Sequence, residues 1–242
     1  MKLVIVRHAD PDYSIDSLTP TGWKEAELLS ERLVKTPADA YYVSPLGRAK
    51  DTASLTLKKL GRTAETKEWL REFSPRIVKP GMDRSTSIWD WLPEIWTKEL
   101  RYYDPEEWYH TDAMRSVNAE QEYKWVTKEF DRLLAFHGYA REGLYYRAVR
   151  PHRDTIVLFC HFGVECVLLS HLLHVSPMPL WHGLCAAASS VTTIYTEERR
   201  QGIASFRANA FGDISHLYAA GEEPSFAARF CETWDNENER HD

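Results

Sequence analysis

Short apolar runs alternate with amphipathic stretches in the first 60 residues of the chain. Leu3 to Val6 is a continuous apolar run rich in β-branched residues, which predicts a strand buried on both faces. Ala40 to Val43 predicts a second short strand, and a second helix is expected to begin around Arg48. Between the two strands, apolar residues recur at roughly helical spacing after a Thr19-Pro20-Thr21-Gly22 start, at Trp23, Ala26, Leu29 and Leu33. Thr19 or Thr21 could serve as the N-cap of that helix.

The same alternation returns after residue 150. Thr155 to Cys160 is the clearest buried strand, and a helix with an apolar side is expected directly after Gly163. Ser190 to Tyr195 and Ile203 to Ala208 predict two further strands joined by a charged turn. Strands that alternate with helices favour an α/β fold, a three-layer sandwich whose largely parallel sheet has helices on both faces.

The sequence pattern changes between about residues 75 and 150, where aromatic residues become frequent. Seven Trp and Tyr side chains crowd the span from 89 to 109, interleaved with acidic residues and prolines, and Glu120 to Phe136 reads as one amphipathic helix. We interpret this segment as a mainly helical, aromatic-rich cap inserted into a single domain of residues 1–242. Most of its aromatics are expected to form the core of the cap, and a minority to face a substrate pocket.

Composition and charge narrow the function classes. The chain has 242 residues and a formal net charge of -6, so it lacks the basic footprint that long nucleic acids or anionic membranes require. No apolar run is long enough for a transmembrane span or a signal-peptide core. Four cysteines without C-x-x-C spacing argue against a disulfide framework, and the expected location is cytoplasmic.

Cationic and cationisable residues follow three of the predicted strands. Arg7 and His8 end the first strand, Arg48 follows the second, and His161 follows the long later strand. The carboxyl ends of parallel strands meet at one edge of a sheet, where ligands bind. Four such groups at one place are costly unless an anion joins them, and phosphate matches the forked donors of arginine. Each element alone is weak evidence, since a lone histidine after a strand is more often structural.

The chain resembles the histidine phosphatase superfamily, the phosphoglycerate-mutase-like clan. The resemblance rests on five segments in the family's order, which cover essentially the whole α/β part: residues 3–9, 18–22, 44–53, 157–163 and 212–217. The aromatic insertion matches only loosely.

This resemblance implies roles for the residues at the strand ends. His8 would be the nucleophile that carries a covalent phosphohistidine, kept neutral by the flanking arginines. Arg7, Arg48 and His161 would hold the equatorial phosphate oxygens during in-line transfer. Phe162 and Ser14 are assigned to the phosphate-binding set as well. With this much fixed positive charge, no metal ion or cofactor is expected.

The resemblance also calls for a general acid after the second helix, which by position is Glu72. The same carboxyl group would then activate water to release phosphate. Glu65, Glu68 and Asp83 are nearby alternatives. His216 matches a family position near the pocket, where a structural hydrogen bond is at least as good an explanation as a catalytic one.

The chain departs from the family pattern at two places. Ala9, Pro11 and Ser14 stand where many members have other phosphate-binding residues. Phe73-Ser74-Pro75-Arg76 replaces the stretch that recognises phosphoglycerate in the mutases, although Arg76 could still reach the pocket. Hydrolysis of a phosphomonoester is therefore favoured over mutase activity.

The predicted function is a metal-independent phosphatase that acts on a small phosphorylated metabolite. A phosphoglycerate mutase and a non-catalytic module that binds a phosphorylated ligand remain the alternatives. A metallohydrolase is disfavoured, because His171 and His174 share a helix face without a further ligand set. Exposed aromatics of the cap would be consistent with a homodimer.

Overall fold

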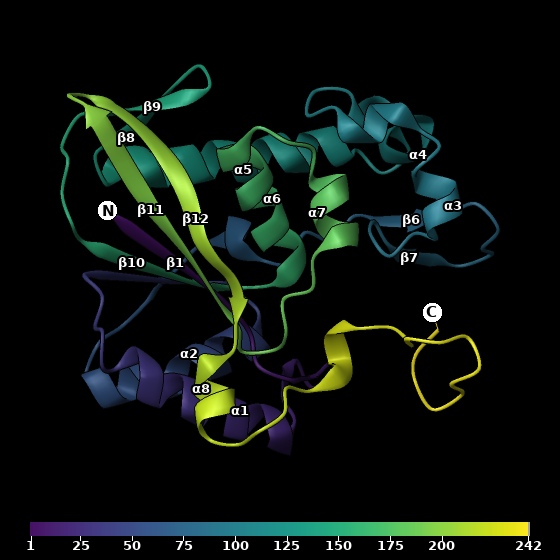
Figure 1. Ribbon diagram of the computed structural model, residues 1–242, viewed down its shortest axis with the longest axis horizontal. Coiled ribbons are helices and arrows are strands. Elements are labelled where there is room, and N and C mark those ends of the chain that lie inside the picture. The colour runs from purple at the N-terminus through teal and green to yellow at the C-terminus, as the bar shows by residue number, and fades with distance from the viewer. Residues whose placement is uncertain (242) are drawn as a thin grey trace.

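A mixed eight-stranded sheet forms the centre of the computed structural model, which describes residues 1–241 (Figure 1). The strands are β1 (Lys2–Arg7), β2 (Pro11–Asp12), β3 (Ser17–Leu18), β4 (Ala40–Val43), β5 (Glu65–Thr66), β6 (Arg76–Val78), β7 (Ser85–Ser87), β8 (Tyr139–Glu142), β9 (Tyr145–Ala148), β10 (Thr155–Cys160), β11 (Val191–Arg200) and β12 (Ile203–Asp213). In the large sheet their order is β5-β4-β10-β1-β11-β12-β9-β8.

Eight α-helices and four short 3₁₀-helices complete the described part of the chain. The α-helices are α1 (Pro20–Leu33), α2 (Gly47–Leu60), α3 (Pro93–Trp96), α4 (Asp112–Arg115), α5 (Ala119–Phe136), α6 (Phe162–Leu173), α7 (Pro177–Gly183) and α8 (Ser215–Ala219). The 3₁₀-helices are η1 (Glu68–Leu70), η2 (Leu100–Tyr103), η3 (Trp108–His110) and η4 (Phe226–Ala228). No helix within residues 1–241 is long and apolar enough to cross a lipid bilayer.

The core of the sheet is parallel, as the alternating pattern predicts. β1 pairs in parallel with β10 from Lys2 opposite Thr155 to Arg7 opposite Cys160, and β10 and β5 pair in parallel with β4. Arg7 and Cys160 therefore reach the same edge of the sheet. The strands expected at 190–195 and 203–208 are longer than the pattern predicts, and they form an antiparallel hairpin whose first strand pairs antiparallel with β1.

Successive side chains of the central strands point into two different apolar layers. Leu3 and Ile5 of β1 pack with α5, α6 and α7, whereas Val4 and Val6 pack with Leu29 of α1 and with α2. Figure 1 shows α1 and α2 on one side of the sheet and α5, α6 and α7 on the other. The three-layer arrangement predicted from the continuous apolar runs is confirmed.

Local capping explains where α1 begins. Thr19 has extended backbone and its hydroxyl oxygen accepts a hydrogen bond from the backbone N–H of Gly22 at 3.0 Å. Pro20 occupies the first helical turn, where its missing N–H costs nothing. Of the two threonines that the sequence offers as N-cap, Thr19 is the one used.

The segment from about 75 to 150 contains β6, β7, α3, η2, η3, α4 and α5, followed by β8 and β9. Trp91, Tyr102 and Trp108 are buried in it, and the Trp108 ring meets Trp181 of α7 edge-on at 5.6 Å between centroids. Its aromatic core is thus continuous with the apolar layer above the sheet. β8 and β9 join the main sheet at its far edge, so the boundaries of the inserted cap stay a prediction.

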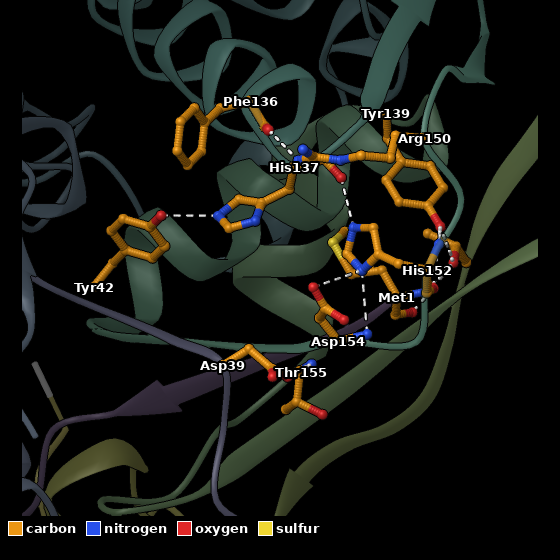
Figure 2. A network of polar contacts seen from close by, with 11 residues as sticks. Met1, Asp39, Tyr42, Phe136, His137, Tyr139, Arg150, His152, Asp154 and Thr155 are labelled. Carbon is orange, nitrogen blue, oxygen red and sulfur yellow. Dashed lines mark hydrogen bonds and ion pairs between the residues drawn. The ribbon is translucent and has the colours of Figure 1, made fainter.

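A polar network ties together the edge of the sheet where β1 and β10 begin (Figure 2). The Tyr42 hydroxyl lies 2.8 Å from His137 Nε2 just after α5, and His152 Nε2 lies 2.6 Å from the carbonyl oxygen of His137. The backbone N–H of Thr155 donates to Asp39 at 2.8 Å. These contacts connect helix and strand ends at the edge opposite to the carboxyl ends of β1 and β10.

Candidate active site

The carboxyl ends of β1, β4 and β10 bring the predicted histidines and arginines together. The rings of His8 and His161 have their centroids 5.0 Å apart, and Arg48 Nε lies 3.4 Å from His8 Nε2. Arg7, His8, Arg48 and His161 are all buried. The structure thus places at one point four residues that come from three distant segments of the sequence.

The contacts of His8 define which ring nitrogen is free. His8 Nδ1 lies 2.8 Å from the backbone oxygen of Ala9, which can only accept, so Nδ1 carries the proton. The N–H at Nε of Arg48 donates to His8 Nε2, which therefore presents its lone pair. An imidazole in this tautomer has Nε2 available as a nucleophile.

Burial and neighbouring cations keep this imidazole neutral. Burial lowers the pKa of His8 well below its usual value, and the Arg7 and Arg48 charges lower it further against the hydrogen bond to Ala9. Burial also lowers the pKa of His161, with His8 and the two arginines acting in the same direction. Both rings thus keep uncharged nitrogens at neutral pH.

The two arginines are fixed by acceptors outside the histidine pair. Arg7 Nη1 donates to the carbonyl oxygen of Ala186, in the loop before β11. Arg48 Nη1 donates to Asp16 Oδ1 at 2.6 Å, while Asp16 Oδ2 accepts from the backbone N–H of Gly47 at 2.7 Å. Asp16 therefore holds both the start of α2 and the guanidinium that this helix carries.

His161 and Arg7 have donors that no neighbouring residue uses. Ser44 Oγ accepts from the backbone N–H of Leu46 at 3.2 Å, so its own proton can go to His161 Nε2 at 2.7 Å. That contact leaves the proton of His161 on Nδ1. Within residues 1–241, His161 Nδ1 and Arg7 Nε are buried without a hydrogen-bond partner. Unpaired buried donors call for an explanation, and an oxyanion bound between them supplies one.

The structure places Glu72 beside the amino end of α6. Its Oε1 accepts from the backbone N–H groups of Phe73 and Val164, at 2.9 Å and 3.1 Å. Burial raises the pKa of Glu72 to about 7, against the opposing effects of these hydrogen bonds and of Arg48 and Arg7. A carboxyl group with this pKa can both give and take a proton near neutral pH.

The alternative acids lie elsewhere. Glu65, Glu68 and Asp83 are exposed, and Glu65 pairs with Lys67 at 2.7 Å. Among the four carboxyl groups considered from the sequence, the geometry favours Glu72.

Another carboxyl group beside the site, Glu165 of α6, was not found from the sequence. It is 1% exposed, and burial raises its pKa to about 7, with the nearby charge of Glu72 in the same direction and a hydrogen bond with Thr192 and the charge of Arg7 opposing. The sequence signal is weak, because a glutamate in an otherwise apolar helix reads as one polar position on its surface.

Of three other residues considered from the sequence, one lies near the cluster and two lie outside it. Phe162 begins α6, and its ring centroid lies 6.0 Å from Arg7 Cζ. Ser14 is exposed and its hydroxyl donates to Asp12 at 2.5 Å, so the geometry does not bring it into the cluster. Arg76 is exposed on β6 and donates to the carbonyl oxygen of Ser85 at 2.6 Å, so it does not reach the cluster either.

His216 is connected to the backbone of His8 through Ser189. Its Nε2 lies 3.0 Å from Ser189 Oγ, and the backbone N–H of Ser189 donates to the carbonyl oxygen of His8 at 3.0 Å. Burial lowers the pKa of His216 to about 4. This contact is the structural alternative that the sequence left open for His216.

The two histidines considered as metal ligands make other contacts. His171 Nε2 lies 2.9 Å from Asp131 Oδ2, and His174 Nδ1 lies 3.1 Å from Arg141 Nη2. Residues 1–241 contain no group of three or more His, Cys, Asp or Glu side chains arranged to hold a metal ion.

Two surface cavities lie along α5, with volumes of about 490 and 600 Å³. Trp125 lines both, and Arg71 and Glu122 form an ion pair in the smaller one. Neither cavity is lined by the histidine and arginine cluster. The chemistry of the cluster, more than cavity size, makes it the candidate active site.

Comparisons with known proteins identify the family of the chain. The family model described as "Histidine phosphatase superfamily (branch 1)" matches residues 3–209. A Hydrogenobacter thermophilus protein provisionally named phosphoserine phosphatase 2 is 38% identical over 82 residues, which are 30% of this chain and 40% of that protein. A 2,3-bisphosphoglycerate-dependent phosphoglycerate mutase of Afipia carboxidovorans is 36% identical over 74 residues, 26% of this chain and 35% of the mutase. These matches span well under half the length of either relative.

Solved structures extend the likeness to most of the chain. The structure of phosphoserine phosphatase from Entamoeba histolytica in complex with 3-phosphoglyceric acid superposes with a TM-score of 0.58 at 18% identity. The match covers 89% of this chain and 98% of that one. At this identity the likeness establishes a shared fold.

Proposed function

The chain belongs to the histidine phosphatase superfamily, and we propose on that basis that it hydrolyses phosphomonoesters of small organic molecules through a phosphohistidine on His8. The single observation that carries the proposal is the pair of contacts on His8. They leave the Nε2 lone pair facing Arg48 in a site where buried donors are unpaired.

In the first step, His8 Nε2 attacks phosphorus and the bond from phosphorus to the leaving oxygen breaks. Arg7, Arg48 and His161 supply fixed donors to the equatorial oxygens, where negative charge is spread in the transition state. The proton on Glu72 passes to the leaving oxygen, so the alcohol departs neutral. Phe162 flanks Arg7 at the start of α6.

In the second step, the Glu72 carboxylate takes a proton from water as the water oxygen attacks phosphorus. The bond from phosphorus to Nε2 breaks, its electron pair returns to His8, and inorganic phosphate leaves. Glu72 is again protonated at the end. Glu72 suits both roles because its pKa of about 7 makes either protonation state accessible. No metal ion takes part in either step.

Mutase activity is the competing proposal, since a phosphoglycerate mutase is among the relatives. A mutase must bind the carboxylate of its substrate and return the phosphoryl group to it. The arginine that could have served this purpose, Arg76, is turned to Ser85. This observation favours hydrolysis, in which water receives the phosphoryl group.

The test measures release of inorganic phosphate from an aryl phosphate, phosphoserine and 3-phosphoglycerate, with a chelator present. We expect chelator-resistant turnover that His8→Ala abolishes. Glu72→Gln should slow an alkyl phosphate far more than p-nitrophenyl phosphate, because the nitrophenolate leaves without needing a proton. Turnover that survives His8→Ala would refute the mechanism, and transfer between phosphoglycerate positions without phosphate release would favour the mutase.

A further inference from the structure

Trp89, in the segment predicted as a cap, reaches the Glu72 carboxyl group across Gly163. A Cβ atom built on Gly163 would lie 2.5 Å from Trp89 Cη2, 2.6 Å from Trp89 Cζ3 and 2.7 Å from Glu72 Oε1. The edge of the indole and the carboxyl oxygen therefore flank the same point on α6. Only a residue without a side chain fits there, so Gly163 permits the approach of the two groups.

An aromatic stack holds Trp89 in this place. Trp89 and Trp181 have ring centroids 5.9 Å apart, and Trp181 stacks on Phe73 at 5.5 Å. Trp181 Nε1 donates to the carbonyl oxygen of Gly163 at 3.0 Å, which anchors the stack to the first turn of α6. The backbone N–H of Phe73 donates to Glu72, so Phe73 also contacts the carboxyl group through its main chain.

Some groups around Glu72 lower the pKa of its carboxyl group, and burial raises it. Arg7 of β1 and Arg48 of α2 favour the carboxylate, as do the N–H groups of Phe73 and Val164. The other titratable groups that share this environment are His8, His161, Glu165, Cys160 and Cys166. The two histidines are neutral and both thiols have raised pKa values, so exclusion of water is the main force that favours the protonated acid.

We propose that Trp89 is a positioning residue whose indole keeps water from the Glu72 carboxyl group and so keeps its proton available for the leaving oxygen. The inference rests on the proposed role of Glu72 as general acid. Trp89 need not touch the substrate, because it acts through the hydration of Glu72. The same physics raises the pKa of a carboxyl group wherever an aromatic ring replaces its water.

The kinetic test compares Trp89→Leu with Trp96→Leu. Both tryptophans are half-buried in the cap segment, but the Trp96 ring packs on Tyr103 and His182, away from Glu72. For an alkyl phosphate, kcat/KM falls on the alkaline side of its pH profile as the general acid loses its proton. In Trp89→Leu this fall should occur at a pH that is lower than in the wild type by at least about one unit. Trp96→Leu should keep the wild-type alkaline limb, and Trp89→Phe, which keeps an aromatic ring, should lie much closer to the wild type than Trp89→Leu does. Ionisation of the substrate is common to all variants and cancels.

A second measurement needs no turnover. In protein labelled with 5-fluorotryptophan, the fluorine resonance missing from Trp89→Phe identifies Trp89. We expect this resonance to titrate near pH 7 in the wild type and in Glu165→Gln, and to stop titrating there in Glu72→Gln. A resonance indifferent to Glu72→Gln, or equal alkaline limbs in Trp89→Leu and Trp96→Leu, would overturn the inference. The resonance could titrate in the wild type and not in Glu72→Gln although no phosphomonoester is hydrolysed. That result would refute the proposed function but support the contact between Trp89 and Glu72.

Discussion

At the scale of single residues, the ring of His8 is set up by its contacts before any substrate arrives. The Ala9 carbonyl oxygen fixes the proton on Nδ1, and Arg48 approaches Nε2 as a donor. Because burial and both arginines lower the pKa of His8, the nucleophile stays neutral throughout the neutral range. Dependence of the rate on pH near 7 should therefore come from Glu72.

Asp16 is expected to matter although it belongs to no recognised motif. Its carboxylate orients the guanidinium of Arg48 through a charge-assisted hydrogen bond at 2.6 Å, and such bonds are about twice as strong as neutral ones. Asp16→Asn should lower kcat/KM for an aryl phosphate roughly tenfold. The loss should be constant from pH 5 to 9, since hydrogen bonds and the Arg48 charge, outweighing burial, lower the pKa of Asp16 below its usual value.

Asp12→Asn is the matched control for this loop. Within residues 1–241 the Asp12 carboxylate accepts hydrogen bonds from Ser14 alone, and it lies near the surface, so its loss should leave kcat/KM within a factor of about two. Equal rates for Asp16→Asn and the wild type would show that Arg48 does not depend on Asp16.

The difference between predicted and unpredicted site residues has a physical reason. His8, Arg48 and His161 each lie within five residues of the end of a predicted strand, so their places at the sheet edge can be inferred from the order of elements. Asp16 lies in a loop that also contains Asp10 and Asp12, and it has a left-handed backbone with φ of 49°. Nothing in the local pattern says which acid turns toward Arg48. The position of Trp89 beside α6 could not be predicted either, because that contact depends on tertiary packing.

Among the elements, segments with a continuous apolar run or a clear amphipathic pattern could be predicted, and short segments without such a pattern could not. The strands at 40–43 and 155–160 match β4 and β10 residue for residue, and the helix expected at 120–136 begins one residue earlier, at Ala119. β5 has two exposed residues and no apolar signal. β9 alternates exposed and buried residues over only four positions, too few to separate it from a loop.

The start of α1 offers a test at this scale. A Cβ atom on Gly22 would lie 2.1 Å from the carbonyl oxygen of Asp10, so Gly22→Ala must push the loop that follows His8 away from α1. We expect the free energy of unfolding to fall by about 1–3 kcal/mol, measured by urea denaturation. Gly183→Ala in α7 meets no atom within 4 Å and should be neutral or slightly stabilising. Equal effects of the two substitutions would contradict the close packing of this loop.

In the whole molecule, two acids with raised pKa values, the half-buried Glu72 and the buried Glu165, lie near Arg7. Glu165 has a pKa of about 7 in the folded protein, whereas an unfolded chain has its usual value near 4.5. Between these two pH values the Glu165 carboxyl group is protonated in the folded protein and ionised in the unfolded chain. The contribution of this proton to the free energy of unfolding is fully present below about pH 4.5 and is lost as the pH rises through 7.

Glu165→Gln should remove this dependence. Between pH 5 and pH 8 the wild type should lose about 2–3 kcal/mol more of its free energy of unfolding than the variant loses. Urea denaturation at the two pH values measures the difference, and Glu68→Gln, an exposed glutamate, serves as the control. Parallel losses in wild type and Glu165→Gln would show that Glu165 does not hold a proton in the folded protein.

Trapping of the phosphoenzyme shows whether His8 carries the phosphoryl group. Wild-type protein is mixed with a ³²P-labelled phosphomonoester, quenched within milliseconds in alkali and digested, because phosphohistidine survives alkali and is lost in acid. We expect alkali-stable, acid-labile label on the peptide that contains His8, with none in His8→Ala. With a labelled aryl phosphate, whose leaving group needs no proton, Glu72→Gln should accumulate more label because only the release of phosphate is slowed. Turnover without label on that peptide, or label on another residue, would contradict the proposed role of His8.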